Sequence, residues 1–111
     1  MEQNAMRSYV DGINQNAPEK IGALFAADGY FSDGAGRLLG SPDGNGTGPA
    51  EITAVFQGIM SQFKMKAVIL RMNQRSMEYD VYLGDEIILP CVGTVTVNER
   101  GEITEYMARP R

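Results

Sequence analysis

The stretch Thr94–Met107, TVTVNERGEITEYM, holds the clearest structural pattern in the chain. Its first four residues alternate threonine with valine, as a strand does when one of its faces is buried. A turn sequence, Asn98–Gly101, follows, and its glycine suits a backbone position with positive φ. A second β-prone run covers Glu102–Met107. The stretch therefore predicts an antiparallel hairpin near the C-terminus.

The same β-prone character reaches upstream from this hairpin as far as Met65. Runs rich in Val, Ile, Thr and Tyr cover Met65–Met72, Ser76–Leu83 and Glu86–Val97, with Leu83-Gly84-Asp85 as a turn between the last two. Together with the final run they predict an antiparallel meander over the second half of the chain.

The first half has helical periodicity instead. Apolar residues recur at i, i+3, i+4 and i+7 on a helix expected from about Gln3 to Asn14; they are Met6, Tyr9, Val10 and Ile13. Pro18 suits the first turn of a second helix, which is expected to end near Asp28-Gly29. That helix would bury Ile21, Leu24 and Phe25.

Two further elements complete the first half. Tyr30–Ser32 is a short β-prone segment, and the glycine-rich run from Gly34 to Gly48 is expected to be a mobile loop. Pro49 opens a third helix with apolar residues at helical spacing; they are Ile52, Val55, Phe56, Ile59 and Met60. Helices grouped before strands predict one α+β domain over residues 1–111, in which a curved antiparallel sheet closes over three helices and encloses an apolar pocket.

Composition limits the possible chemistry. The chain has 111 residues, no histidine, one cysteine and a formal net charge of −4. Without histidine there is no imidazole base and no histidine metal site, so acid–base chemistry would need a carboxylate, a tyrosine or a lysine. Cys91 reads as a small buried residue, because no basic partner is indicated. Neither a metal nor another cofactor is expected.

The charge distribution also bears on partners and location. Neither half of the chain carries a basic stripe, so neither nucleic acid nor an anionic membrane is an expected partner. No apolar run approaches the roughly 18 residues that span a bilayer, and Met1–Met6 is more polar than a signal peptide. The expectation is a cytoplasmic protein.

Several segments resemble one known family. YVDGIN at Tyr9–Asn14, IGALFAADGYFSDGAG at Ile21–Gly36 and GPAEITAVF at Gly48–Phe56 are similar in order and spacing to bacterial ketosteroid isomerases. VTVNERGEITEYMA at Val95–Ala108 resembles the last hairpin of that family. The resemblance implies the cone-shaped α+β fold of the nuclear transport factor 2-like superfamily, which also contains SnoaL-like cyclases and limonene epoxide hydrolases.

The resemblance also implies site residues. It assigns the general base to Asp33 and the tyrosine oxyanion donor to Tyr9. It places Gly93 where the family has a protonated aspartic acid as a second donor, and Phe25 and Gln57 where some members have supporting tyrosines. The apolar wall for a steroid-like ketone is expected to comprise Phe25, Phe56, Ile59, Met60 and Met107. Members of this family pair through the sheet, which implies a homodimer.

Three functions stay open at this point. The first is an isomerase that moves a C=C bond into conjugation with a ketone by proton transfer through a dienolate. The second is a non-catalytic binding protein for a hydrophobic small molecule, because Gly93 carries no acid. The third is a SnoaL-like cyclase or lyase that uses Asp33 as its base. The other side chains bear less directly on these alternatives: Tyr79 and Tyr82 are expected on the sheet, at a dimer face, and Arg109 reads as a solvated surface charge.

Overall fold

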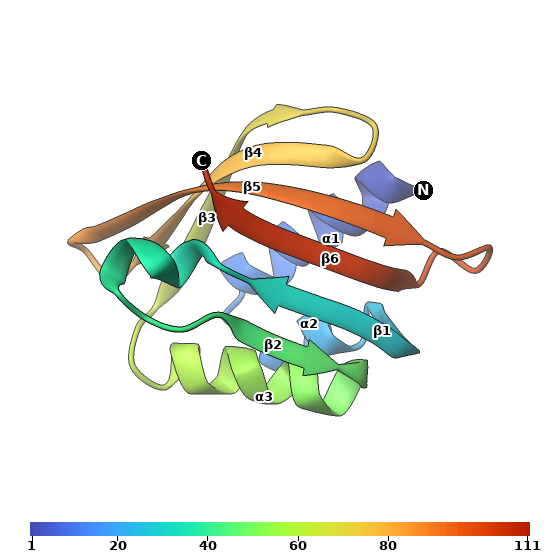
Figure 1. Ribbon diagram of the computed structural model, residues 1–111, viewed down its shortest axis with the longest axis horizontal. Helices are drawn as coiled ribbons and strands as arrows, with labels where there is room; N and C mark the ends of the chain where they lie inside the picture. The colour runs from blue at the N-terminus through green and yellow to red at the C-terminus, as the bar shows by residue number, and fades with distance from the viewer.

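A six-stranded sheet organises the protein, and the computed structural model describes residues 1–111 (Figure 1). The strand order is β2-β1-β6-β5-β4-β3, and every neighbouring pair is antiparallel except β1 with β6. The strands are β1 (Phe25–Asp33), β2 (Gly44–Thr47), β3 (Met65–Met72), β4 (Ser76–Leu83), β5 (Ile87–Val97) and β6 (Ile103–Pro110). The α+β fold class predicted from the sequence is confirmed, with the difference that the sheet is mixed.

Three α-helices cover one face of this curved sheet (Figure 1). They are α1 (Glu2–Asn14), α2 (Pro18–Gly22) and α3 (Gly48–Met60), and a short 3-10 helix, η1 (Ala35–Leu39), follows β1. The apolar stripe predicted on α1 is buried along its whole length. The main hydrophobic core therefore lies between the helices and the inner face of the sheet.

The C-terminal hairpin has the predicted turn. Gly101 takes a φ of 79°, and the Asn98 side chain accepts hydrogen bonds from the backbone N–H groups of Arg100 and Glu102, both at 3.0 Å. Val95 faces the core while Thr94 and Thr96 face outward. Local sequence therefore determines both the turn and the burial of β5.

Two asparagines fasten the end of α1 to the edge of the sheet. The side chain of Asn14 bonds the backbone N–H and C=O of Ala67, at 2.7 and 3.1 Å, and Asn16 bonds those of Met65, at 2.8 and 2.9 Å. These bonds satisfy backbone groups that an edge strand otherwise leaves open. They also fix the position of α1, and of Tyr9 within it, over the inner face.

The second predicted helix is shorter than expected, and the segment after it is a strand. The helix ends at Gly22, and β1 begins at Phe25 instead of Tyr30. Parallel pairing with β6 accounts for the difference, because Phe25 lies opposite Ile103, whose N–H donates to the carbonyl of Leu24 at 2.9 Å. The hydrophobic periodicity placed Phe25 correctly in the core but in the wrong element.

The glycine-rich run expected to be a loop instead contains η1 and β2. Arg37 on η1 holds Asp43 through two hydrogen bonds of 2.8 and 2.6 Å. Strand β2 pairs with β1 and lies close to α3: a Cβ on Gly46 would come within 3.2 Å of the α3 backbone. Glycine therefore allows a helix and a strand to pack closely here.

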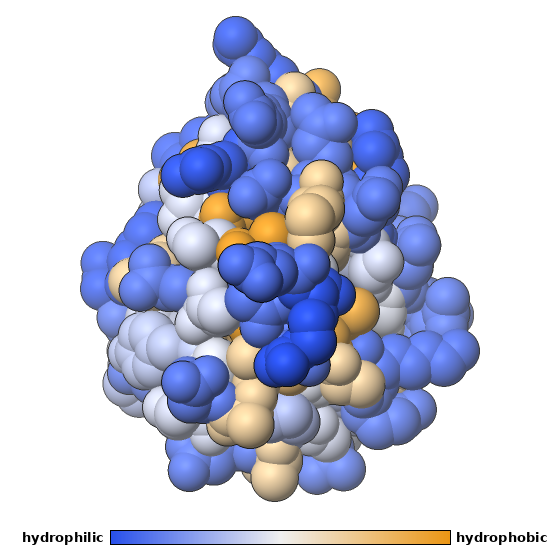
Figure 2. Space-filling model, turned by 90° about the vertical axis from the view of Figure 1, so that its right-hand side faces the viewer, coloured by the Kyte–Doolittle hydropathy of each residue, from blue (hydrophilic) through white to orange (hydrophobic).

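The two ends of the molecule differ. The end that carries the β5–β6 turn presents a mainly hydrophilic face, on which apolar atoms form only small patches (Figure 2). The opposite end of the molecule is formed by η1, the C-terminus of α3 and the turn between β4 and β5 (Figure 1). No helix is both long enough and apolar enough to cross a membrane.

Candidate active site

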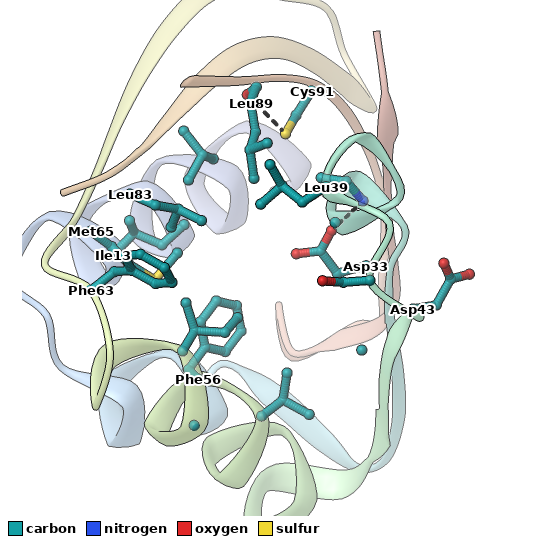
Figure 3. A pocket seen from close by; sticks show the side chains of 18 of the residues that line it. Ile13, Asp33, Leu39, Asp43, Phe56, Phe63, Met65, Leu83, Leu89 and Cys91 are labelled. Atoms are coloured by element: carbon teal, nitrogen blue, oxygen red, sulfur yellow. Dashed lines mark hydrogen bonds between the residues drawn. The ribbon is translucent and has the colours of Figure 1, made fainter. Parts of the chain in front are cut away.

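A cavity of about 460 Å³ lies between the sheet and the helices. Of the 22 residues that line it, 14 are hydrophobic. The lining residues come from α1, β1, η1, β2, α3 and β3–β5, and from the loops that follow η1 and α3. Several of the apolar side chains are shown in Figure 3: Ile13, Phe56, Phe63, Met65, Leu83 and Leu89. The volume lies within the range found for small-molecule sites, and most of the lining is apolar.

Asp33 places a carboxylate in this apolar cavity (Figure 3). It is the last residue of β1, and its Oδ1 accepts a hydrogen bond of 2.8 Å from the backbone N–H of Ala35. Burial raises the pKa of Asp33, while the Ala35 hydrogen bond and the positive charge of Arg109 oppose the rise. A carboxylate that is poorly solvated and has a raised pKa is suited to accept a proton from carbon.

Backbone pairing on both sides of β1 fixes the position of Asp33. It lies opposite Ala108 of β6 and Gly44 of β2, and the N–H of Gly34 donates to the carbonyl of Ala108 at 2.8 Å. The Asp43 carboxylate, across the same loop, points away from the cavity (Figure 3). Both acids line the cavity, but only the Asp33 carboxylate points into it.

Arg109 is half-buried, which corrects its expected role as a solvated surface charge. Its guanidinium donates to the hydroxyl and the carbonyl of Ser32, at 3.1 and 3.3 Å, and to the carbonyl of Ala108 at 2.7 Å. These hydrogen bonds link the C-terminal end of β1 to β6, next to Asp33. The charge of Arg109 also lowers the pKa of Asp33.

Tyr9 lines the cavity from α1. Its ring stacks on Tyr106 with centroids 4.2 Å apart and meets Phe56 edge-on at 5.9 Å. Burial, the neighbouring Tyr106 and the negative charge of Asp33 all raise the pKa of Tyr9 well above 10. Tyr9 is therefore neutral at physiological pH and able to donate a hydrogen bond.

The structure places four of the predicted residues on the cavity and four elsewhere. Asp33, Tyr9, Phe56 and Ile59 line it. Phe25 lies in the core against Phe31, with centroids 6.1 Å apart. Met60, the last residue of α3, packs half-buried at the margin of the core. The other two, Met107 and Gly93, lie on the sheet and are not part of the lining.

An irregularity in β6 explains the position of Met107. The register with β5 shifts between Thr96 and Val97, so that Thr104 is left without a partner. Ile103 and Tyr106 then both face the core, three residues apart, and Met107 turns to the outer face. In a regular strand, Met107 would share the inner face with Ile103.

Gly93 faces inward beneath two tyrosines. A Cβ at this position would overlap the Tyr106 hydroxyl oxygen and lie 2.9 Å from Tyr106 Cζ and 3.1 Å from Tyr79 Cε1. The Tyr106 hydroxyl donates to that of Tyr79 at 3.0 Å. The space that an acid would occupy is therefore filled by a hydrogen-bonded tyrosine pair.

Tyr79, Ser41 and Gln62 are polar cavity residues that were not predicted from the sequence. Tyr79 lines the cavity, whereas it had been expected at a dimer face with Tyr82. Inward and outward residues alternate along β4, and Met77, Tyr79, Val81 and Leu83 are the buried set. The alternation of these residues with Glu78, Asp80 and Tyr82 was the signal that could have placed Tyr79 inside.

Cys91 lines the cavity as a buried thiol. It donates to the carbonyl of Leu89 at 3.3 Å, and burial with the charge of Asp33 raises its pKa to about 12. It is therefore neutral and packs as a small apolar residue. No three side chains among His, Cys, Asp and Glu gather as a metal site would require.

Comparison with known proteins supports the fold. No protein-family model matches the chain, and no curated protein matches its sequence. Among solved structures, a cystatin-like-fold protein from Methylobium petroleophilum is 19% identical, with a TM-score of 0.76 over 98% of this chain and 74% of its own. A nuclear transport factor 2-like protein from Mesorhizobium loti is 17% identical, with a TM-score of 0.74 over 99% and 90%.

The fold is that of nuclear transport factor 2-like proteins. A third structure with this architecture is a proposed ketosteroid isomerase from Kribbella flavida, which is 22% identical with a TM-score of 0.74 over 99% of this chain and 77% of its own. At these identities the likeness establishes the architecture, and the function must be argued from the residues of the cavity.

Proposed function

We propose that this protein is a cofactor-independent isomerase of the ketosteroid isomerase type. The observation that carries the proposal is that Asp33 and Tyr9, from β1 and α1, line one apolar cavity. Such a reaction needs a base that takes a proton from carbon and a donor for the oxygen that becomes negative. A buried carboxylate and a neutral phenol supply these two groups.

In the proposed reaction the Asp33 carboxylate removes the α-proton of an unsaturated ketone. The electrons of the broken C–H bond form a dienolate, whose oxygen accepts a hydrogen bond from Tyr9. Asp33, now neutral, returns the proton to the γ-carbon, and the C=C bond moves into conjugation with the C=O. Protonation of Asp33 is assisted by the burial that raises its pKa.

The cavity also supports a substrate class. Its lining is mostly hydrophobic, and its phenylalanine, leucine and methionine side chains are suited to a largely apolar, steroid-like ketone. The volume of about 460 Å³ lies within the range of small-molecule sites.

A second candidate function is non-catalytic binding of a hydrophobic small molecule. The specific observation that favours it is the absence of an acid at Gly93, where tyrosines occupy the space. Such a protein would bind planar ketones without turning them over.

The test measures the ultraviolet absorbance of the conjugated product when Δ5-androstenedione is added. Turnover above the buffer rate supports the isomerase. Binding of the ketone without turnover, measured by calorimetry, supports the second candidate instead. Absence of both contradicts both functions.

Arg109, whose charge acts on Asp33, allows a test by the pH dependence of kcat/KM. Because Arg109 lowers the pKa of Asp33, Arg109→Gln should raise that pKa. The base acts as the carboxylate, so the acid limb of the kcat/KM profile should move to higher pH. Arg111→Gln is the matched control, since Arg111 pairs with Asp80 at 2.9 Å. An acid limb that stays in place in Arg109→Gln would show that this charge does not act on the base.

We further propose that the protein forms a homodimer through the outer face of the sheet. Val68 and Leu70 of β3 and Ile88 of β5 are 37%, 54% and 54% exposed, and large apolar side chains exposed on a sheet favour an interface. Leu70→Glu should convert a dimer to a monomer in light scattering. Leu38→Glu is the control, because Leu38 is 53% exposed but lies on η1. A monomeric wild type would contradict the proposal.

A further inference from the structure

The Tyr79–Tyr106 pair holds a second hydroxyl at the cavity, and its arrangement assigns it a part in ligand recognition. We propose that Tyr79 donates a second hydrogen bond to the ligand oxygen that Tyr9 contacts, and that Tyr106 is the residue that positions it. The inference rests on the proposed function of this cavity, since it concerns the oxygen of the same ketone or dienolate.

Of the two tyrosines, only Tyr79 is within reach of a ligand. The Tyr106 and Tyr79 hydroxyls are hydrogen-bonded at 3.0 Å. Tyr79 lines the cavity and Tyr106 does not. A phenol has one proton to donate, so with Tyr106 as the donor of this pair, Tyr79 keeps its own proton for a partner in the cavity.

Tyr79 also lies near Tyr9. The Tyr9 ring stacks on Tyr106 with centroids 4.2 Å apart, and the Tyr106 hydroxyl lies 3.0 Å from that of Tyr79, so Tyr9 and Tyr79 flank the same ring. Both side chains line the same cavity. Two neighbouring donors can converge on one oxygen, as the donors of an oxyanion site do.

The tyrosine pair is also held rigidly. Tyr79 and Tyr106 are fully buried, and Tyr106 is held by stacking on Tyr9 at 4.2 Å. Gly93 leaves the space that the two rings fill. Donors fixed before a charge develops need little reorganisation, and this is the condition under which they stabilise an anion well.

The ligand chemistry follows from two neutral donors facing an apolar cavity. The two donors are Tyr9 and Tyr79, and burial raises the pKa of both, so both remain protonated. They suit an oxygen that carries or acquires negative charge on a planar apolar skeleton, such as a dienolate or an aromatic phenolate. Tyr79 thus takes the place of the acid that Gly93 lacks.

The activity test compares Tyr79→Phe with Tyr82→Phe. Both substitutions remove one hydroxyl from β4, but Tyr82 faces outward. Loss of one donor to an oxyanion typically slows catalysis by about 10²–10³-fold. A loss of kcat of about 10-fold or more in Tyr79→Phe alone supports the proposal. A smaller loss, or an equal loss in Tyr82→Phe, overturns it.

A binding test gives a readout that does not depend on turnover. The probe is 2-naphthol, whose anion absorbs at longer wavelength than the neutral form, and the background is Asp33→Asn, which removes the competing carboxylate charge. Tyr79→Phe should lower the ratio of bound naphtholate to naphthol by about 10-fold, and Tyr82→Phe should not. An unchanged ratio, or no binding of the probe, overturns the proposal.

The two tests separate this inference from the proposed function. A wild type that does not isomerise, but whose bound naphtholate depends on Tyr79, removes the isomerase and keeps Tyr79 as a binding residue. Turnover that depends on Asp33 but not on Tyr79 keeps the isomerase and removes this inference. Tyr106→Phe should lower kcat with little change in KM, because it acts through Tyr79; a change confined to KM contradicts that positioning role.

Discussion

Replacing Asp33 by asparagine is expected to slow isomerisation by about 10²–10⁴-fold, the usual contribution of a general base. Asparagine keeps the shape of the side chain, and its oxygen can still accept from the N–H of Ala35, but it cannot take a proton from carbon. The rate is measured by the ultraviolet absorbance of the conjugated ketone. Affinity for that product should be retained, because the apolar walls are unchanged.

The matched control makes the same substitution on the same strand. Asp28 is exposed and lies outside the cavity, so Asp28→Asn should keep the wild-type rate. Equal rates for wild type and Asp33→Asn would show that Asp33 is not the base. Loss of rate in both variants would indicate a general effect on the strand.

Measurements of Tm show whether Asp33→Asn loses activity because it lacks the base or because it is less stable. The pKa of Asp33 is raised in the folded state by burial, so ionised Asp33 opposes folding above that pKa. Asp33→Asn should therefore have a higher Tm than wild type at neutral pH, and the difference should shrink as pH falls and the acid becomes protonated. In a domain of this size, about 1 kcal/mol corresponds to a shift of roughly 4–8 °C. A lower Tm at neutral pH would contradict the assigned burial effect.

Local sequence determined those parts of the protein whose burial follows a regular period. The stripe on α1 placed Tyr9 in the interior, and the alternation at Thr94–Val97 placed Val95 there. Strand β2 could not be predicted this way, because its glycines are selected by the close approach of α3 at Gly46. The position of Asp33 came from resemblance to a family, and no hydrophobic pattern would have given it.

Breaks in periodicity account for the residues that were misplaced. The unpaired Thr104 reverses the side-chain direction along the rest of β6, which brings Tyr106 inward and sends Met107 outward. The register of β1 likewise shifts between Phe25 and Tyr30. Such irregularities depend on the partner strand, so they leave little trace in the strand's own sequence. The Tyr79–Tyr106 pair over Gly93 results from the irregularity in β6 together with the pairing of β4, β5 and β6.

Introducing an acid at position 93 should destabilise the folded protein. We expect Gly93→Asp to lower the free energy of unfolding by at least about 2 kcal/mol, because it overpacks a filled core and buries a carboxyl group. The Tyr106 ring cannot move aside easily, since it is fully buried and stacked on Tyr9. Urea unfolding at neutral pH measures the loss, and Gly93→Ala isolates its steric part.

Gly58 supplies the matched control for that substitution. It lies in α3, and a Cβ there would meet nothing within 4 Å. Gly58→Ala should therefore leave stability unchanged or raise it by about 0.5–1 kcal/mol, because alanine favours a helix more than glycine does. A large loss in both variants would mean that the effect is not specific to the space under the tyrosines.

A double-mutant cycle tests whether Tyr106 is the residue that leaves no room for a side chain at position 93. Tyr106→Ala alone should cost about 3–5 kcal/mol by opening a cavity. Combined with Gly93→Asp, it should cost less than the sum of the two single losses, because the new side chain then occupies space that the ring has left. Additive losses would show that Tyr106 is not what excludes an acid. A coupled loss would mean that the Tyr106 ring is what excludes an acid from position 93.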